Sequence, residues 1–351
     1  MQRRTTLKEV AAHAGVSYQT VSKVLNRQGQ VSSETEARIW ESVRALGYRP
    51  NSLARNLRSQ QSHMIGYSWA PSSPEQVNPI LDQFLQSMAQ SAESAGYHLL
   101  AFPHRSGGEW IAAYAELIDT NRVDGFVISS VEYDDSRIAF LMERNFPFVA
   151  FGRSNPELNF PYVDVDGAAG MQAIVEHLLS LGHRRLAVLA WPSTSCAGQH
   201  RMQGFLAALQ GAGISTPDTW IARGEGSYAF GFQATKRWLK EDEARRPTAI
   251  VAFNDLMAIG AIDAAQDAGM RVGIDFAITG FDDAPLTQYL NPPLTSVRQP
   301  VWKIGREVMH LLLKLLQAGE LTPEEAQILL TPQLIVRSSS QPLISKSREL
   351  G

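Results

Sequence analysis

The chain has 351 residues, of which 44% are hydrophobic and 19% are charged, a composition typical of a globular protein with more than one domain. It has no uninterrupted apolar stretch of about eighteen residues and no apolar segment after its first arginines, so we expect a cytoplasmic protein without membrane association. Its single cysteine, Cys196, excludes an internal disulfide and a zinc cluster made of thiolates.

The net charge of −3 hides an uneven distribution along the chain. Residues 1–62 contain ten Lys and Arg against four Glu, a balance of +6, and the rest of the chain carries −9. A basic N-terminal segment on an acidic body is typical of a protein that binds phosphate groups with that segment.

Two short amphipathic helices are predicted in the first 26 residues. Thr6 and Glu9 form a capping-box pattern at the start of the first helix, and Gly15 can end it in a left-handed conformation. Ser17 can then cap a second helix with an apolar face. In such a helix-turn-helix, the first turn of the second helix presents side chains to base edges in the major groove. An ordinary helical hairpin with a solvated polar face would account for the same pattern.

The following thirty residues favour the DNA-binding alternative. A third helix is predicted from a capping box at Ser33 and Glu36 to a stop at Gly47. A short cationic helix capped by Asn51 follows, with Leu57 on its apolar edge. So short a helix is unstable alone in water, so we expect it to fold on DNA and to insert a leucine into a minor-groove step.

From residue 64 onward, short apolar runs alternate with amphipathic helical segments, which predicts parallel sheets covered by helices on both faces. Two successive series of such units predict two α/β lobes. Strands are expected at 65–69, 98–102, 123–129, 148–151, 186–190, 248–253, 276–280 and 327–336. Helices are expected at 80–95, 109–120, 136–144, 166–181, 199–210, 229–239, 256–268 and 302–316.

Polar residues that follow the predicted strands are the candidates for a ligand site, because ligands of open α/β sheets bind beyond the carboxyl ends of the strands. Asn254 and Asp282 lie at such ends, and Arg201 lies early in the helix after another strand. Together these groups suit sugar hydroxyls, which both donate and accept hydrogen bonds. Taken singly, Asn254 and Asp282 are better explained as turn or cap residues, and Arg201 as a surface arginine.

The stretch TLKEVAAHAGVSYQTVSKVLN and the residues up to 58 resemble the DNA-binding head and hinge of the lactose/galactose repressor family. The resemblance implies DNA contacts by Thr6, Ser17, Tyr18, Gln19, Thr20, Ser22, Lys23, Asn26, Asn51, Ala54, Leu57 and Arg58. Lys23 stands where a sugar-responsive member of the family has arginine. Lysine keeps the charge but loses the two-pronged contact with guanine, so the base read there is expected to differ.

The resemblance extends through the body of the chain in the motifs HLLSLGHRRLA, HRMQGF, FNDLMAIG, GFDDAP and NPPLTSVRQP. It implies a core like a periplasmic binding protein, with effector contacts at Ala70, Arg201, Tyr228, Asn254 and Asp282. Tyr228 is expected to stack on the effector, the alternative being a helix-end tyrosine that packs on its own lobe.

Two departures from the family pattern, Gly152 and Val301, predict a different effector from that of the lactose-responsive members. The segment PFVAFGR, residues 147–153, is similar to that of α-glucoside regulators, so an α-glucoside is the expected effector.

The expected fold is α/β, with a three-helix helix-turn-helix domain at 1–50, a hinge helix and linker at 51–62, a two-lobed core at 63–340 and a polar tail at 341–351. The first lobe is expected at about 63–164 and 296–323, and the second at about 165–295 and 324–340. The tail has no heptad repeat, so a homodimer is expected, and its two-fold symmetry suits a palindromic operator.

The function implied by the resemblance is a transcriptional repressor of sugar-utilisation genes that a small sugar releases from its operator. A sugar-binding protein of the periplasmic type without a role at DNA is the alternative. The chain has no phosphate-loop, GxSxG or HExxH motif, so we expect no enzymatic activity, no cofactor and no metal.

Overall fold

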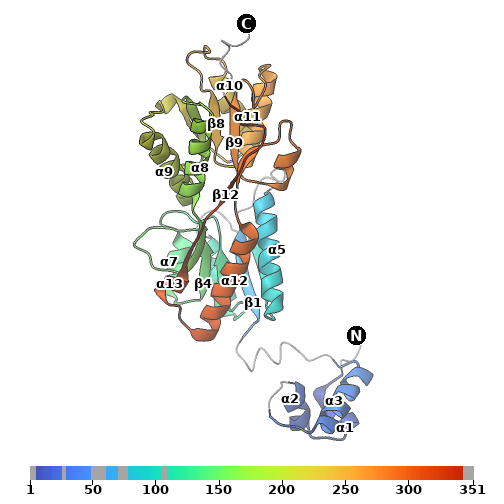
Figure 1. The fold of residues 1–351 in the computed structure, drawn as a ribbon. Helices are drawn as coiled ribbons and strands as arrows, with labels where there is room; N and C mark the ends of the chain where they lie inside the picture. The colour runs from blue at the N-terminus through green and yellow to red at the C-terminus, as the bar shows by residue number, and fades with distance from the viewer. Residues whose placement is uncertain (1–4, 26–28, 49–60, 70–77, 104–108, 343–351) are drawn as a thin grey trace. The chain divides into compact units, whose positions relative to one another are not determined.

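The computed structural model describes residues 5–25, 29–48, 61–69, 78–103 and 109–342. The chain forms two units, Met1–Ser62 and His63–Gly351, each with its own hydrophobic core (Figure 1). The first unit is helical, and the second contains two six-stranded sheets covered by helices. The predicted fold class is therefore confirmed. None of the described helices is long and apolar enough to cross a membrane.

The described helices of the first unit are α1 (Leu7–Ala14), α2 (Tyr18–Leu25) and α3 (Ser33–Ala45). The capping box of α1 forms as predicted: the Thr6 hydroxyl accepts from the Glu9 N–H at 3.3 Å, and the Thr6 N–H donates to the Glu9 carboxylate at 2.7 Å. Gly15 turns the chain with φ of 64°, a conformation that is strained for residues with a Cβ. The Ser17 hydroxyl then accepts from the Thr20 N–H at 3.1 Å and caps α2.

The start of α3 differs from the prediction by one residue. Ser32, and not Ser33, is the N-cap, and its hydroxyl accepts from the Thr35 N–H at 3.3 Å. The predicted capping box between Ser33 and Glu36 was therefore wrong, because the two adjacent serines carry the same group and spacing alone does not choose between them. The small core of this unit consists of Val10, Ala11, Ala14, Val21, Val24, Ile39, Val43 and Tyr48. The short helix predicted after Asn51 lies outside the described residues.

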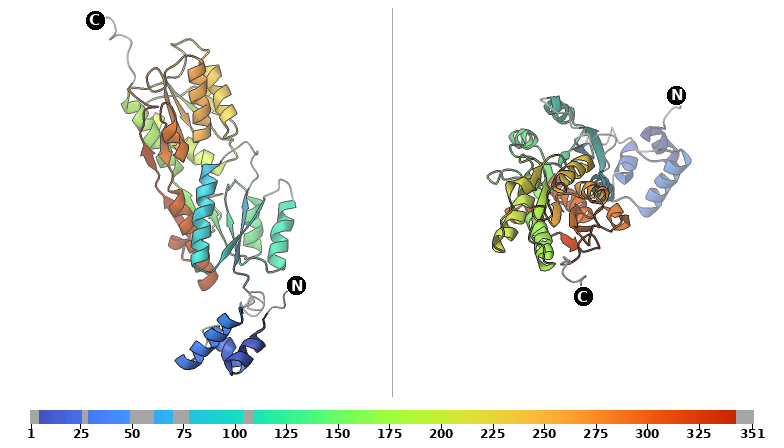
Figure 2. Two further views of the ribbon diagram at one scale, coloured as in Figure 1. Left: turned by 90° about the vertical axis from the view of Figure 1, so that its right-hand side faces the viewer. Right: turned by 90° about the horizontal axis from the view of Figure 1, so that it is seen from above.

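The first lobe of the core is built on a sheet of order β11-β5-β4-β3-β1-β2, in which every neighbouring pair is parallel. Its strands are β1 (Met64–Trp69), β2 (His98–Pro103), β3 (Gly125–Ile128), β4 (Phe148–Phe151), β5 (Tyr162–Val165) and β11 (Gln327–Leu330). Its helices are α5 (Pro79–Ser94), α6 (Glu109–Asp119), α7 (Ser136–Glu143), α12 (Val301–Ala318) and α13 (Pro323–Ala326). Helices α5 and α12 lie side by side (Figures 1 and 2).

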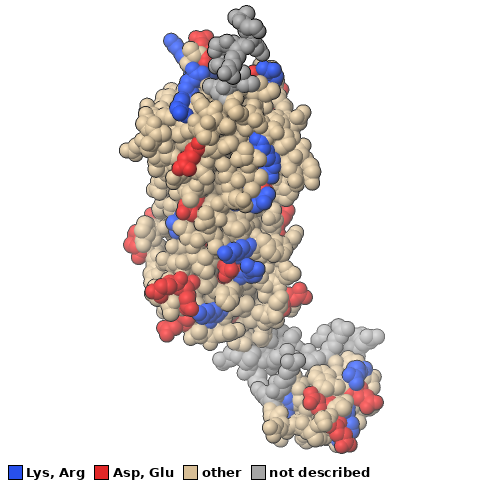
Figure 3. All heavy atoms as spheres, viewed as in Figure 1, with Lys and Arg blue, Asp and Glu red and all other residues tan. Residues whose placement is uncertain are grey.

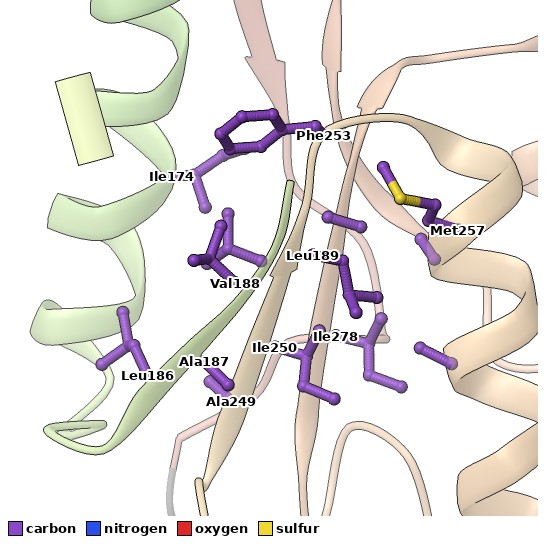
Figure 4. Close-up of a cluster of buried hydrophobic side chains, with 14 of the residues drawn as sticks. Ile174, Leu186, Ala187, Val188, Leu189, Ala249, Ile250, Phe253, Met257 and Ile278 are labelled. Atoms are coloured by element: carbon purple, nitrogen blue, oxygen red, sulfur yellow. The ribbon is translucent and has the colours of Figure 1, made fainter. Parts of the chain in front are cut away.

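The second lobe is built on a sheet of order β12-β10-β9-β8-β6-β7, which is parallel except between β10 and β12. Its strands are β6 (Leu186–Ala190), β7 (Ile221–Arg223), β8 (Ala249–Ala252), β9 (Ala277–Asp282), β10 (Thr295–Arg298) and β12 (Gln333–Ile335). Its helices are α8 (Gly167–Ser180), α9 (Cys196–Gly211), α10 (Tyr228–Trp238) and α11 (Asp255–Asp267), with 3₁₀ turns η1 (Asp218–Trp220) and η2 (Pro285–Tyr289). Figure 4 shows the buried strand residues Val188, Ile250 and Ile278 between Ile174 of α8 and Met257 of α11.

The chain passes between the two sheets three times: after β5, after β10 and between β11 and β12. The first passage lies at the predicted boundary, and the other two do not. Residues 296–298 were expected in the first lobe but pair with β9. Residues 327–330 were expected in the second lobe but pair with β5, and only Gln333–Ile335 joins the second sheet. The apolar pattern of 327–336 is continuous, so it does not reveal that one predicted strand is two strands in different sheets.

Candidate functional site

Helix α2 exposes a polar face on the first unit. Tyr18, Gln19 and Lys23 are exposed, while Val21 and Val24 are buried on the opposite face. Gln19 and Lys23 lie one helical turn apart, so the amide and the ammonium group share one face. The helix carries no carboxylate. An exposed amide and cation on a helix without negative charge suit contacts with base edges and phosphates.

The other described residues that were predicted at DNA have structural partners in this unit. Thr6 and Ser17 are exposed helix caps, so they lie where unbonded backbone N–H groups can attract phosphates. Thr20 and Ser22 are half-buried, and the Thr20 hydroxyl lies 2.8 Å from that of Ser17. The described surface of this unit that faces the viewer in Figure 3 carries charges of both signs. The predicted contacts at Asn26, Asn51, Ala54, Leu57 and Arg58 lie outside the described residues.

A cavity of about 460 Å³ lies between the two lobes of the core. Tyr67, Trp69, Ser129 and Phe151, at or just after the carboxyl ends of β1, β3 and β4, form part of its first-lobe wall. Trp191, Asn254 and Asp282, at the carboxyl ends of β6, β8 and β9, form part of its second-lobe wall. The volume is that of a small-molecule site, and the location is the one expected for facing parallel sheets.

Arg201 of α9 is the buried cation of the second-lobe wall, with 5% of its surface exposed. Its guanidinium carbon lies 3.6 Å from the ring centre of Phe281 and 4.4 Å from that of Trp191. One of its nitrogens donates to the Phe253 carbonyl, and another lies 3.9 Å from the Asp282 carboxylate. Burial lowers the pKa of Arg201 to about 10, against the opposing effect of Asp282, so the group stays charged at neutral pH. Its fixed orientation favours directed hydrogen bonds to a ligand.

Asp282 faces Arg201 from the end of β9. Its Oδ1 accepts from the Gln299 amide at 2.6 Å. Burial raises the pKa of this carboxyl to about 6, although Arg201 and Gln299 lower it. Its φ of 120° is one that residues with a Cβ rarely adopt, and such local strain is concentrated at binding sites. Asp282 is therefore an acceptor whose charge depends on pH just below neutrality.

Asn254 caps a helix, as was considered from the sequence, and it also lines the cavity. It is the N-cap of α11, with its carbonyl oxygen accepting from the Met257 N–H at 2.9 Å. Its amide nitrogen donates to the Gly226 carbonyl at 2.8 Å. A Cβ at Gly226 would lie 2.6 Å from that nitrogen and 2.7 Å from the indole nitrogen of Trp191, so a glycine is needed for this close approach.

Asp255, the next residue, is a second buried carboxylate of the wall. It accepts from the Ser296 hydroxyl at 2.6 Å and from the Ala284 N–H at 2.7 Å. Burial raises its pKa well above the ordinary value, and the charge of Asp282 raises it further. Asp255 was not among the residues predicted from the sequence, because neither its burial nor its proximity to Asp282 can be seen there.

Tyr228 does not line the cavity, contrary to the prediction that it stacks on the effector. It is the first residue of α10 and is 42% exposed. Its hydroxyl donates to Asp263 at 2.7 Å, and its ring stacks on Phe232 with 6.1 Å between ring centres. The alternative of a tyrosine that packs on its own lobe is the one observed. Trp191 of this lobe lines the cavity, and sequence reasoning did not select it although it directly follows β6.

Arg153 and His200 connect the two lobes at the cavity wall. The Nε of Arg153 donates to Asp164 at 2.7 Å, and its Nη2 lies 3.2 Å from Nδ1 of His200 on α9. Arginine can only donate, so Nδ1 of His200 is the acceptor and the imidazole is neutral. Burial and, secondarily, the charge of Arg153 lower the pKa of His200, which agrees with this assignment. Arg153 ends the segment PFVAFGR, which therefore contributes Phe151, Gly152 and Arg153 to the cavity. Ala70 lies outside the described residues.

Two family models match the chain. One describes bacterial regulatory proteins of the lacI family and matches residues 6–51, and the other describes a periplasmic binding protein-like domain and matches residues 175–340. Among the described residues, no group of three or more His, Cys, Asp or Glu is arranged to hold a metal ion.

Two curated relatives match nearly the whole chain. The HTH-type transcriptional regulator CelR of Thermobifida fusca is 33% identical over 343 residues, which cover 96% of this chain and 99% of that protein. The HTH-type transcriptional repressor CytR of Escherichia coli strain K12 is 32% identical over 341 residues, which cover 96% of this chain and 97% of that protein.

Solved structures show the same similarity. A regulatory protein of the LacI family from Chloroflexus aggregans is 50% identical, with a TM-score of 0.75 over 80% of this chain and 99% of that one. A lac repressor dimer bound to operator and the anti-inducer ONPF has a TM-score of 0.83 at 29% identity, over 97% of this chain and 100% of that one. A complex of CelR with cellobiose has a TM-score of 0.73 at 30% identity, over 96% of this chain and 100% of that one. With a lacI-type head, a two-lobed cleft and relatives matched over nearly its full length, the chain belongs to the lacI family of bacterial regulatory proteins.

Proposed function

We propose that this transcriptional repressor binds an α-glucoside in the cavity between its lobes, and that the bound sugar releases it from a palindromic operator. The observation that carries the proposal is the convergence of Arg201, Asn254 and Asp282 with the ring of Trp191 in one cavity. Cation, amide and carboxylate can bond hydroxyls as donors and acceptors, and a flat ring suits the apolar face of a sugar.

The size of the cavity, about 460 Å³, suits a sugar of one or two rings. α- and β-glucosides differ in the configuration of the anomeric carbon that forms the glycosidic bond. The similarity of CelR, whose solved complex contains the β-linked cellobiose, argues for the general class of ligand. The contribution of Phe151, Gly152 and Arg153 to the wall supports the choice of the α-linked class, since these residues belong to the segment that is similar to α-glucoside regulators.

The proposed mechanism is a linkage between the cavity and the head. A sugar that contacts both walls favours one arrangement of the lobes, and in a cytoplasmic homodimer this arrangement alters the spacing of the two heads on the operator. Such coupling is reciprocal, so operator DNA should weaken sugar binding by the same factor as sugar weakens operator binding.

A gel-shift titration with a symmetric duplex, at fixed low salt, tests the proposal. Maltose should release the protein from the duplex, while cellobiose at the same concentration should not. Sucrose, a second α-glucoside, and an uncharged nucleoside extend the comparison to other linkages and to other ring systems. Release by cellobiose or by the nucleoside, but not by maltose, would refute the α-glucoside assignment and leave the repressor function intact.

A thermal-shift series with the same compounds measures ligand binding without DNA. A ligand that binds only the folded protein raises its melting temperature by mass action, so maltose should raise it in a concentration-dependent way. Equal sugar affinities in the presence and absence of operator would contradict the linkage.

A further inference from the structure

A second cavity, of about 580 Å³, adjoins the sugar cavity at the passage between β10 and α12. It is lined from both lobes. Arg298 and Arg337 belong to the strand ends of the second lobe, whereas Lys303 and Arg306 lie on α12 of the first lobe. A ligand in this cavity would therefore contact both lobes, and the arrangement of these lobes is what the sugar is proposed to change.

The charge of this cavity is positive. Its lining includes the four cations and two carboxylates, Asp282 and Asp283. Asp283 is already satisfied: its side chain is 3% exposed and accepts from Arg298 Nε and from an Arg337 nitrogen, each at 2.7 Å. Asp282 faces Arg201 in the sugar cavity. Within the described part of the chain, Lys303 and Arg306 have no carboxylate partner, so their charges are uncompensated.

The beginning of α12 adds donors to the same wall. Pro300, Val301, Trp302 and Lys303 all line the cavity, so the helix starts at its surface. No side chain caps this helix, and its first turn carries no acidic residue. The first N–H groups of a helix lack partners within it and attract negative charge. The Val301 N–H already donates to the Gln299 carbonyl at 2.9 Å, which leaves the N–H groups of Trp302 and Lys303 beside the cationic side chains of the same wall.

The two cavities share one wall. Asp282, Ala284 and Gln299 line both, and the hydrogen bond from Gln299 to Asp282 lies in this shared wall. A sugar that takes over the Asp282 carboxylate would compete with Gln299 for it. A ligand in the second cavity can therefore influence sugar binding by two routes, through the shared wall and through the lobes that it bridges.

We propose that this second cavity binds a small phosphate-bearing anion, with Lys303 and Arg306 of the first lobe and Arg298 of the second as its ligands. Arg298 uses Nε for Asp283 and is 52% exposed along its side chain, so its terminal nitrogens can reach the anion. An anion held between Arg298 and α12 ties the lobes together at a point distinct from the sugar cavity. The repressor would then integrate a neutral sugar and an anionic metabolite.

The test is isothermal titration of the full-length protein with inorganic phosphate, pyrophosphate and glucose 6-phosphate, with glucose as the matched neutral compound. The variant Lys303→Gln/Arg306→Gln keeps two exposed, helix-compatible side chains and removes two charges. It should lose at least about tenfold in anion affinity, since each removed cation takes a charge-assisted hydrogen bond away from the anion. If glucose 6-phosphate binds more tightly than inorganic phosphate, the ligand of this cavity is a phosphate ester. If inorganic phosphate binds more tightly, the ligand is the free anion.

The control variant is Lys236→Gln/Arg237→Gln, which removes the same charge from two exposed positions of α10. It should bind the anion like the wild type. The basic head is unchanged in this control and in the α12 variant, so anion binding by the head would be equal in the two proteins. Equal anion affinity of the α12 variant and the control, or no binding at millimolar concentration, would overturn the proposal. Arg201→Lys separates the two sites: it should lose sugar binding and keep anion binding, so failure of the sugar proposal would not be mistaken for failure of this one.

Discussion

The two walls of the sugar cavity are built from different chemistry. The second-lobe wall holds its charged groups in fixed positions, with Arg201 bound to a carbonyl and to two rings and Asp255 bound to a hydroxyl and an N–H group. The first-lobe wall is mainly rings, aliphatic side chains and hydroxyls. Its charged groups are Glu132 and the pair of buried Asp164 with Arg153, which is 26% exposed along its side chain.

This difference assigns separate tasks to the lobes. Polar groups that are fixed before the ligand arrives lose little freedom on binding, so the second lobe is suited to provide most of the affinity. The rings of the first lobe determine which shapes fit against them, and its rim arginine contacts the opposite lobe. Mutations in the second-lobe wall should therefore act mainly on affinity, whereas mutation of Arg153 should also act on the arrangement of the lobes.

Arg201→Lys should have the largest effect, because lysine keeps the charge but loses the planar contact with Phe281 and Trp191 and the directed hydrogen bonds. We expect sugar affinity to fall by about 100-fold, measured by titration calorimetry, with operator binding unchanged in a gel shift. Circular dichroism of the same sample verifies folding. A variant that binds sugar normally would show that the second-lobe wall is not the anchor.

Sugar affinity should depend on pH through Asp282. Its pKa is raised to about 6 by burial, so most molecules carry the ionised acceptor at pH 7 and only about one in ten at pH 5. Hydroxyls donate best to the ionised form, so affinity should decrease by about tenfold from pH 7 to pH 5. In Asp282→Asn, which keeps the size and shape of the side chain but cannot ionise, this dependence should disappear. Unchanged pH dependence in the variant would assign the effect to another group.

The same carboxyl should make the core less stable as pH rises from about 4 to about 6. Its folded-state pKa lies above its ordinary value, so the folded protein binds more protons in this range and loses stability as they dissociate. At pH 7.5, Asp282→Asn should therefore be more stable by on the order of 2 kcal/mol, and the difference should shrink toward pH 4. Thermal denaturation of both proteins across this range measures both effects.

Arg153→Gln should have a smaller effect, because its bonds to Asp164 and His200 lie at a partly exposed rim. Losing the contact between lobes should decrease sugar affinity by about threefold, as expected for one partly solvated hydrogen bond. If saturating sugar also lowers operator affinity less in this variant than in the wild type, the mutation has changed the arrangement of the lobes. A loss as large as that of Arg201→Lys would remove the distinction between the two walls.

Tyr228→Phe should have the smallest effect, since this residue lies outside the cavity. Loss of its exposed hydrogen bond to Asp263 should leave sugar affinity within about twofold and stability within about 1 kcal/mol of the wild type. The contrasting variant Trp191→Leu should reduce sugar affinity clearly more, because the indole lines the cavity and contacts Arg201. If Tyr228→Phe is the more damaging of the two, the original prediction of an effector-stacking tyrosine regains support.

Local signals in the sequence predicted local structure well. The caps at Thr6 and Ser17 and the stop at Gly15 depend on neighbours three or four residues away, so the start and turn of the first helices could be predicted. The positions after strands also placed Arg201, Asn254 and Asp282 in one cavity, because parallel strands end at the same edge of a sheet.

Contacts between distant segments could not be predicted in the same way. The pair of Arg153 and His200 joins two lobes, and its geometry depends on how the lobes face each other. Trp191 and Tyr228 both occur near the start of helical segments, and only packing decides which ring reaches the cavity. Strands β5, β7 and β10 each include a charged residue, so they lack the continuous apolar run by which the other strands were predicted.

The edge strands β11 and β12 have a consequence for biosynthesis. Each of the two sheets receives one of its two edge strands from the last part of the chain, at 327–330 and 333–335. Proteins are made from the N-terminus, and domains generally fold as units as they emerge. The helical head, with its own core in the first fifty residues, can therefore fold on the ribosome long before the sensor behind it is complete. A truncated product of translation would retain the head and lack the means to respond to the sugar.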